Sequence, residues 1–244
     1  MKIAFAEDNP ILKQAIKQTN TEAIYAPDLE SACAKITNQE AEALIAGIDY
    51  TSRDVILACR DYLGTVSDTF SSCFVMKNAD QTLIVADAAT CKHPTEDQLY
   101  DIVIQTYHTA TKLLDVPKIA LLSFSTLGSG GHDDTMTMIQ NVIKRVHAEH
   151  PDILIDGELQ LDAAINPQVA AKKAPGSKVA GSANVLICPD LNSGNILYKS
   201  LEQFAGFTAA GPILQGFTYP ASDLSRGSTV DDVIEVIHVL EQIK

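Results

Sequence analysis

The chain has 244 residues, of which 46% are hydrophobic, enough for one large domain or two smaller domains with cores of their own. Its formal net charge of −13, the low aromatic content and the absence of tryptophan exclude a surface built for nucleic acid or for an anionic membrane. An anionic ligand therefore needs a local site of arginine, backbone N–H groups and helix N-termini.

The cysteines are odd in number and widely spaced, and they form no ligand-spaced set with the histidines: Cys33, Cys59, Cys73, Cys91 and Cys188. This pattern predicts free thiols in a reducing compartment and no metal. No apolar run approaches the roughly 20 residues that cross a bilayer, and the N-terminus lacks the apolar core of a signal peptide. We expect a soluble, cytoplasmic protein that binds neither membrane nor nucleic acid.

Apolar runs alternate with amphipathic stretches in the first part of the chain, a pattern typical of buried parallel strands joined by helices. We expect strands over 2–6, 23–26 and 42–48, a helix over 10–18, and a helical segment after each later strand. The pattern breaks over 73–89, where two apolar runs flank Asn78-Ala79-Asp80, so an antiparallel hairpin is expected there.

Alternation resumes after the hairpin and predicts an α/β fold. A helix is expected over 95–114, with Thr95 as its N-cap. Further helices are expected over 133–147, 163–173, 196–204 and 229–243, and strands over 118–124, 153–159, 183–189 and 209–217. If there are two domains, their boundary lies near the hairpin.

Ligands of open parallel α/β sheets bind at the loops that follow the strands. The loop after 118–124 carries Ser125, Thr126 and Ser129 among glycines, which favours anion binding over a merely flexible loop; it lacks the GK[ST] ending of a P-loop. The loop after 183–189 carries Asn192 and Asn195, although helix capping alone explains most of its composition.

Carboxylates follow another predicted strand, at Asp156, Glu158 and Asp162. They could form a metal site of oxygen ligands, but no EF-hand spacing is present. A cluster that holds other side chains in place is the better interpretation.

The stretch "DLSRGSTVDD", from Asp223 to Asp232, raises two interpretations. Ser228 or Thr229 can cap the final helix, with acidic residues in its first turn. Arg226 opposes the helix dipole and therefore needs an anionic partner. That partner is either Asp223, in a simple loop ion pair, or a substrate phosphate or polarised carbonyl.

Several stretches together resemble the phosphate acetyl/butyryltransferase family. They are "LLSFSTLGSG", "DGELQLDAAINPQVAAKKAPGSKVAGSANVLICPDLNSGNILYKSL", "GPILQGF" and "DLSRGSTVDD", which occur in order from about Ile119 to the end. Weaker similarity extends upstream through "EALIAGIDYTSRDV" and "LIVADAATCKHPTEDQL".

The resemblance implies a homodimeric acyltransferase that moves an acetyl group reversibly between coenzyme A and phosphate. It implies two α/β domains with mostly parallel sheets and an active-site cleft between them: domain I over 1–74 plus 217–244 and domain II over 75–216. The partners would be acetyl-CoA, phosphate and acetyl phosphate; coenzyme A is a substrate, and no bound cofactor or metal is required.

The resemblance also implies residue roles. Ser225 and Arg226 match the family's essential Ser-Arg pair, and Asp232 matches the base that would take the thiol proton of coenzyme A. Ser225 would orient the thiol, and Arg226 would stabilise the developing charge. The phosphate would rest against a set of hydroxyl and amide side chains at Ser125, Thr126, Ser129, Asn192 and Asn195, and Gln215 would also contact substrate.

The sequence departs from the family pattern in its N-terminal part. Usual members are longer there, which implies a shortened domain I. Leu57 stands where the family places an arginine for coenzyme A, so Arg53 or Arg60 would have to substitute. Ala88 replaces a family cysteine that the mechanism does not need. Two alternatives stay open: a longer acyl chain such as butyryl, and a non-catalytic regulatory module. A dehydrogenase is disfavoured because no GxGxxG follows a strand.

Overall fold

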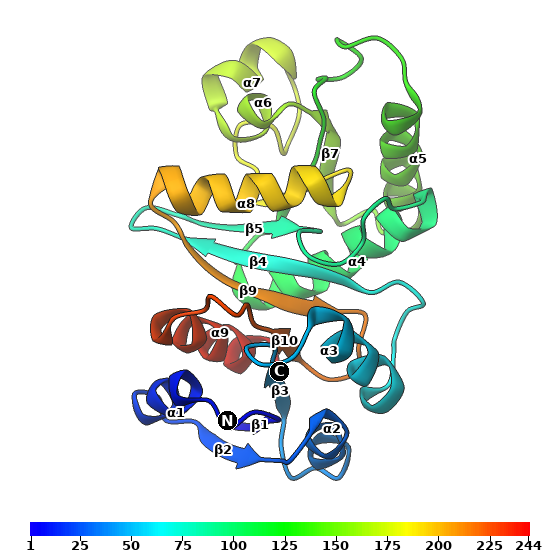
Figure 1. Cartoon of the computed structure of the whole chain (residues 1–244). Coiled ribbons are helices and arrows are strands. Elements are labelled where there is room, and N and C mark those ends of the chain that lie inside the picture. Colours follow the sequence, from blue (N-terminus) through cyan, green and yellow to red (C-terminus); the bar gives the residue numbers. More distant parts are fainter. The chain divides into compact units, whose positions relative to one another are not determined.

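The computed structural model describes residues 1–244, which form two compact units. Unit 1 contains Met1–Phe70 and Thr208–Lys244, and unit 2 contains Ser71–Phe207. Figure 1 shows the elements of each unit. None of the helices has the length and apolarity needed to cross a membrane.

Unit 1 contains five strands, in the order β2-β1-β3-β10-β9. Its strands are β1 (Lys2–Phe5), β2 (Glu22–Tyr25), β3 (Ala43–Ala46), β9 (Thr208–Gln215) and β10 (Ala221–Asp223). Strands β2, β1, β3 and β10 are parallel, and β9 runs antiparallel to β10. The parallel arrangement follows from the alternation of short apolar strands with helices.

The helices of unit 1 are α1 (Pro10–Lys17), α2 (Leu29–Thr37), α3 (Ser52–Ala58) and α9 (Val230–Ile243), and a π-helical turn, η1 (Cys59–Leu63), extends α3. The last helix, α9, packs against α1 and β9. The Nζ atom of Lys244 lies 3.0 Å from Glu42 Oε1, so the C-terminal residue also contacts the N-terminal part of the unit.

Unit 2 also contains five strands, in the order β4-β5-β8-β6-β7. Its strands are β4 (Ser71–Lys77), β5 (Thr82–Ala86), β6 (Lys118–Leu122), β7 (Leu154–Leu159) and β8 (Val185–Ile187). The predicted hairpin is confirmed, because β4 and β5 pair antiparallel; β5, β8, β6 and β7 are parallel. The loops that follow β5, β8 and β6 therefore leave one edge of the sheet side by side.

The helices of unit 2 are α4 (Glu96–Leu113), α5 (Asp134–Glu149), α6 (Leu161–Ile165), α7 (Pro167–Lys173) and α8 (Leu191–Ala205). Thr95 caps α4, as expected, in a capping box with Gln98. The expected α/β fold is confirmed, with local corrections. Helix α8 begins at Leu191 instead of Ile196, because Asp190 caps it. The single helix expected over 163–173 is two helices, because Asn166 caps a new helix that starts at Pro167.

Candidate active site

The predicted catalytic segment of unit 1 is a tight turn between β10 and α9. The backbone N–H of Ser225 donates to Ser228 Oγ at 3.1 Å, and the N–H of Gly227 donates to Ser225 Oγ at 3.1 Å. The N–H of Ser228 also donates to the carbonyl of Ser225 at 2.9 Å. The turn is closed by its own polar groups, and it leaves the side chains of Ser225 and Arg226 exposed to solvent.

Asp232 lies in the first turn of α9 and forms a capping box with Thr229. Its Oδ2 accepts hydrogen bonds from the backbone N–H and the hydroxyl of Thr229, at 2.8 and 2.9 Å. The hydroxyl of Thr229, in return, accepts from the N–H of Asp232 at 3.3 Å. Thr229, and not Ser228, is thus the N-cap. The other carboxylate oxygen, Oδ1, has no partner within the chain, and the side chain is partly exposed.

Arg226 forms no ion pair with any carboxylate of the chain, and its side chain is exposed. The simple loop ion pair with Asp223 is therefore wrong. Asp223 is only 3% exposed, and its hydrogen-bond partner is the hydroxyl of Ser52 at the start of α3. The Arg226 guanidinium, just before a helix N-terminus, thus has no anionic partner within a chain of net charge −13.

Arg53 and Arg60 belong to α3 and to η1, and both are exposed. The Nε atom of Arg60 lies 2.7 Å from Asp61 Oδ1, and this pairing raises the pKa of the arginine. Arg53 forms no such pair. Of these two arginines, Arg53 is the one without an ion pair within the chain. Leu57, on the same helix, is partly buried.

Glu7 organises the loop that leads into α3. It follows β1, is 4% exposed, and its carboxylate accepts hydrogen bonds from four successive backbone N–H groups of the β3–α3 loop, from Gly47 to Tyr50, at 2.8 to 3.3 Å. A ring of backbone N–H groups is an anion site. Here the acceptor is the Glu7 side chain, and its hydrogen bonds fix the loop that leads to Arg53.

In unit 2, the loop after β6 contains the predicted phosphate-binding hydroxyls. Ser125 is fully buried, and its hydroxyl donates to Glu158 Oε1 at 3.1 Å and accepts from the N–H of Gly130 at 2.8 Å. Thr126 is 3% exposed, and its hydroxyl bonds with the side chain and the backbone N–H of Gln160. Ser129 is exposed, although its Oγ accepts from the N–H of Thr126 at 3.0 Å.

Asn192 and Asn195 occupy the first turns of α8, after the neighbouring strand β8. Asn192 is exposed, and the amide of Asn195 donates to the carbonyl of Ala88 at 3.3 Å. A Cβ atom on Gly194 would lie 2.0 Å from the carbonyl oxygen of Asp87, so only glycine permits this approach of α8 to the β5–α4 loop. These contacts place the start of α8 against the loop that follows β5.

Asp87 organises that loop in the manner of Glu7. Its carboxylate accepts hydrogen bonds from Ser72 and from the backbone N–H groups of Ala89, Thr90 and Cys91. Burial raises the pKa of Asp87 more than these hydrogen bonds lower it. Sequence reasoning missed both Glu7 and Asp87. The sequence pattern that could have revealed them is an acidic residue shortly after a buried parallel strand.

The predicted site residues thus divide between the two units. Unit 2 brings the loops of Ser125, Thr126, Ser129, Asn192 and Asn195 to one edge of its sheet, where helix α8 directs its N-terminus. Unit 1 contains Ser225, Arg226, Asp232, Arg53, Arg60 and Gln215; Gln215 ends β9 and is 5% exposed. No group of three or more histidine, cysteine or acidic side chains of residues 1–244 is arranged to hold a metal ion.

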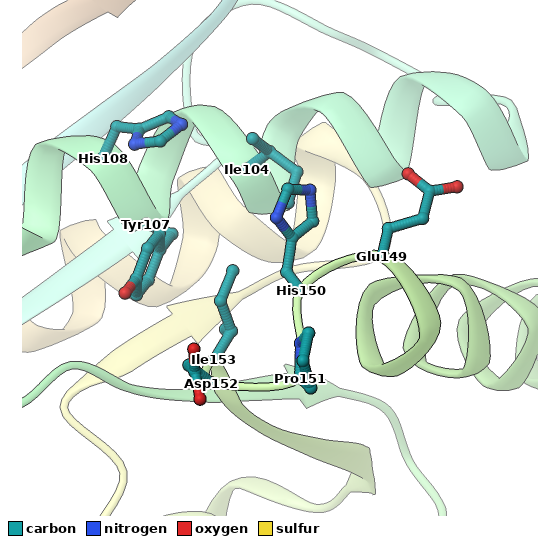
Figure 2. A pocket seen from close by; sticks show the side chains of 8 residues that line it. All are labelled: Ile104, Tyr107, His108, Glu149, His150, Pro151, Asp152 and Ile153. Atoms are coloured by element: carbon teal, nitrogen blue, oxygen red, sulfur yellow. The ribbon is translucent and has the colours of Figure 1, made fainter.

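A separate cavity of about 260 Å³ lies near the opposite, amino-terminal edge of the unit 2 strands. Figure 2 shows Tyr107 and His108 from α4 on one side and His150 and Asp152, from the segment before β7, on the other. It contains none of the predicted site residues.

These features define an α/β protein in which polar, glycine-containing loops follow the parallel strands. The chain belongs to the phosphate acetyl/butaryl transferase family, whose model matches residues 10–240. It is 51% identical over 158 residues to a phosphate acetyltransferase from Clostridium acetobutylicum, covering 64% of this chain and 47% of the relative. It is 39% identical over 217 residues to a phosphate acetyltransferase from Treponema pallidum, covering 84% of this chain and 65% of the relative.

Among solved structures, a phosphotransacetylase from Streptococcus pyogenes superposes with a TM-score of 0.87 at 28% identity, covering 100% of this chain and 93% of that one. The chain spans about half the length of the Clostridium acetobutylicum relative and about two thirds of the Treponema pallidum relative.

Proposed function

We propose that the chain is a phosphate acetyltransferase, which transfers an acetyl group reversibly between acetyl-CoA and inorganic phosphate and acts in the cytoplasm as a homodimer. The family membership and the names of the relatives support this activity. The structural observation that carries the proposal is Arg226: an exposed arginine with no ion pair, followed six residues later by a carboxylate with one free oxygen.

In the proposed reaction Asp232 accepts the thiol proton of coenzyme A on Oδ1, while Oδ2 keeps its hydrogen bonds with Thr229. The thiolate then attacks the carbonyl carbon of acetyl phosphate, and the exposed guanidinium of Arg226 stabilises the negative charge that develops on the carbonyl oxygen. Ser225 orients the thiol. The carbon–oxygen bond to phosphate breaks as the thioester forms. The departing phosphate oxygen takes up the proton that Asp232 accepted, so phosphate leaves as the hydrogen phosphate dianion and the Asp232 carboxylate is regenerated.

The phosphate is proposed to rest in the loops of unit 2, and Gln215 is proposed as a further substrate contact. Arg53 is the preferred coenzyme A contact on α3, because Arg60 is paired with Asp61. Coenzyme A acts as a substrate; no bound cofactor or metal has a role in this scheme.

The assay follows the loss of coenzyme A thiol on addition of acetyl phosphate. Arg226→Ala and Asp232→Asn should each lower kcat by at least about a hundredfold. Asparagine retains an oxygen for the Thr229 cap, so Asp232→Asn removes the base and keeps the helix start. Asp231→Asn, one residue earlier and exposed, is the matched control and should retain activity.

Turnover that survives both substitutions would refute the mechanism, and an inactive parent protein would favour the non-catalytic alternative. An assay with butyryl phosphate as a second acyl donor tests the alternative that the chain prefers a longer acyl group. A pocket separates such donors by only about 1–3 kcal/mol per methylene, so the ratio of the two kcat/KM values assigns the acyl preference.

A further inference from the structure

Glu158 lies beneath the glycine-rich loop of unit 2 and contacts it at several points. It is fully buried at the end of β7. Its Oε1 accepts hydrogen bonds from the hydroxyl of Ser125 and the backbone N–H of Gly128, and its Oε2 accepts from Gln140 Nε2 at 3.2 Å. Its own carbonyl accepts from the N–H of Leu127 at 3.0 Å. One residue therefore fixes three successive parts of the loop.

The Glu158 carboxylate is ionised despite its burial. Burial by itself raises the pKa of a carboxyl group, but the hydrogen bonds from Gly128, Gln140 and Ser125 outweigh it, and the pKa of Glu158 lies below its usual value. At neutral pH the loop thus encloses the Glu158 carboxylate in the place where its backbone N–H groups could have held a ligand.

Most of the polar groups named in this loop already form hydrogen bonds within the protein. Besides the N–H of Gly128, the N–H of Gly130 is taken by Ser125 Oγ and that of Thr126 by Ser129 Oγ. The hydroxyls of Ser125 and Thr126 are buried against β7, where they bond with Glu158 and Gln160. Neither hydroxyl faces solvent, whereas Ser129 and Asn192 do.

We infer that Glu158 is a positioning residue of the phosphate site, which acts by holding the Ser125–Gly130 loop through the Ser125 hydroxyl and the Gly128 N–H. Ser125 and Thr126 then brace the loop against β7, and phosphate is contacted by the exposed side chains, Ser129 and Asn192. This inference rests on the proposed function and changes the roles of Ser125 and Thr126 within it.

The test is a double-mutant cycle on Ser125→Ala and Glu158→Gln, read as KM for acetyl phosphate and KM for coenzyme A separately. Glu158→Gln replaces charge-assisted hydrogen bonds by neutral ones, so KM for acetyl phosphate should rise about tenfold while KM for coenzyme A changes less than about twofold. Because both residues act through one contact, the double variant should be little worse than the worse single variant.

Additive effects of the two substitutions would overturn the inference, because they would make Ser125 an independent phosphate ligand. A lower Tm with both KM values unchanged would also overturn it, since Glu158 would then serve stability alone. Asp152→Asn is the matched control, because it makes the same chemical change at an exposed position before the opposite end of β7.

Direct binding separates this inference from the proposed function. Inorganic phosphate is titrated into the parent protein and into Glu158→Gln, with ³¹P NMR line broadening as the readout. A parent that neither binds phosphate nor turns over acetyl phosphate refutes the proposed function. A parent that binds phosphate no better than Glu158→Gln refutes the positioning role, whatever the reaction is.

Discussion

Asp223 and Glu158 are both buried carboxylates, but their surroundings drive their ionisation in opposite directions. Glu158 accepts hydrogen bonds from three groups, and its pKa is lowered. Asp223 leaves Oδ1 without any partner, and the neighbouring Glu7 adds repulsion. Burial, opposed by one hydrogen bond from Ser52, raises the pKa of Asp223 to about 6.

The ionised form of Asp223 should therefore destabilise the folded protein at neutral pH. Its folded pKa of about 6 lies above the ordinary value of 3.8, so the native state binds the extra proton between these values. The free energy of unfolding should fall by about 3 kcal/mol as the pH rises from about 4 to above 6. Asp223→Asn should remove this fall, which urea unfolding at pH 4.5 and at pH 7.5 would measure.

Other groups also titrate in this range, so the informative quantity is the difference between parent and variant at each pH. That difference should favour Asp223→Asn more strongly at pH 7.5 than at pH 4.5. The exposed Asp68→Asn should show no such change with pH. Equal differences at the two pH values for Asp223→Asn would contradict the assignment of the ionisation to Asp223.

At the scale of loops and helices, both units contain acidic side chains that hold a loop by hydrogen bonds. Glu7, Asp87 and Glu158 each accept hydrogen bonds from a strand-to-helix loop. In each case an acidic side chain replaces an external anion as the partner of the loop's N–H groups. These hydrogen bonds hold each loop without an external ligand, and we expect such an arrangement to lower the ordering cost of binding.

In the loop held by Glu7, Gly47 is a position where a side chain cannot be accommodated. It has a φ of +113°, and a Cβ atom there would lie 2.4 Å from Asp223 Oδ1 and 2.5 Å from the carbonyl oxygen of Leu224. Gly47→Ala should lower the free energy of unfolding by at least about 3 kcal/mol, because backbone strain adds to the clash.

Gly176→Ala is the matched control, since Gly176 also has a positive φ, of +88°, and no atom lies within 4 Å of its Cβ position. It should lose only about 1 kcal/mol, from backbone strain alone. Equal losses for the two variants, measured by urea unfolding, would show that the close approach of Gly47 to Asp223 and Leu224 contributes nothing to the cost of the substitution.

The sequence predicted the long elements well, because hydrophobic periodicity is strong in them. It missed β10, whose three residues Ala221, Ser222 and Asp223 contain no apolar run and are held by their register with β3. The first turn of α8 was missed because its Asn, Ser and Gly are loop formers; Asp190 supplies the cap that overrides this preference.

For the site, sequence patterns could locate the loops but not the state of their side chains. The serine and threonine hydroxyls after β6 predict an anion site, but only the structure places the hydroxyls of Ser125 and Thr126 against β7. The expected holding role of the carboxylate cluster is confirmed for Glu158. Asp162 instead pairs with Lys173, and Asp156 accepts from the N–H of Gly157. Such choices between partners depend on distances that one sequence does not contain.

At the scale of the whole molecule, the cysteines are distributed over both units and are all free. Four of them are buried: Cys33, Cys59, Cys73 and Cys188; Cys91 is partly exposed. Burial raises the pKa of Cys33 to about 11 and the pKa values of Cys73 and Cys188 to about 12, and it also raises the pKa values of Cys59 and Cys91. Only the thiolate reacts with disulfide reagents, so the native protein should be nearly inert.

The reactivity of the cysteine thiols therefore reports whether the cores of both units stay closed in solution. At pH 8, a thiol with a pKa of 11 is ionised in roughly one molecule per thousand, so Ellman's reagent should titrate at most one thiol of the native protein within minutes. All five should react after unfolding in guanidinium chloride. Cys91→Ala should abolish the native reaction and leave the other four to appear on unfolding. Two or more rapidly reacting thiols in the native protein would mean that a core opens in solution. Protein thiols that do not react with Ellman's reagent also suit the assay of the proposed activity, because the reagent then reports only the thiol of coenzyme A.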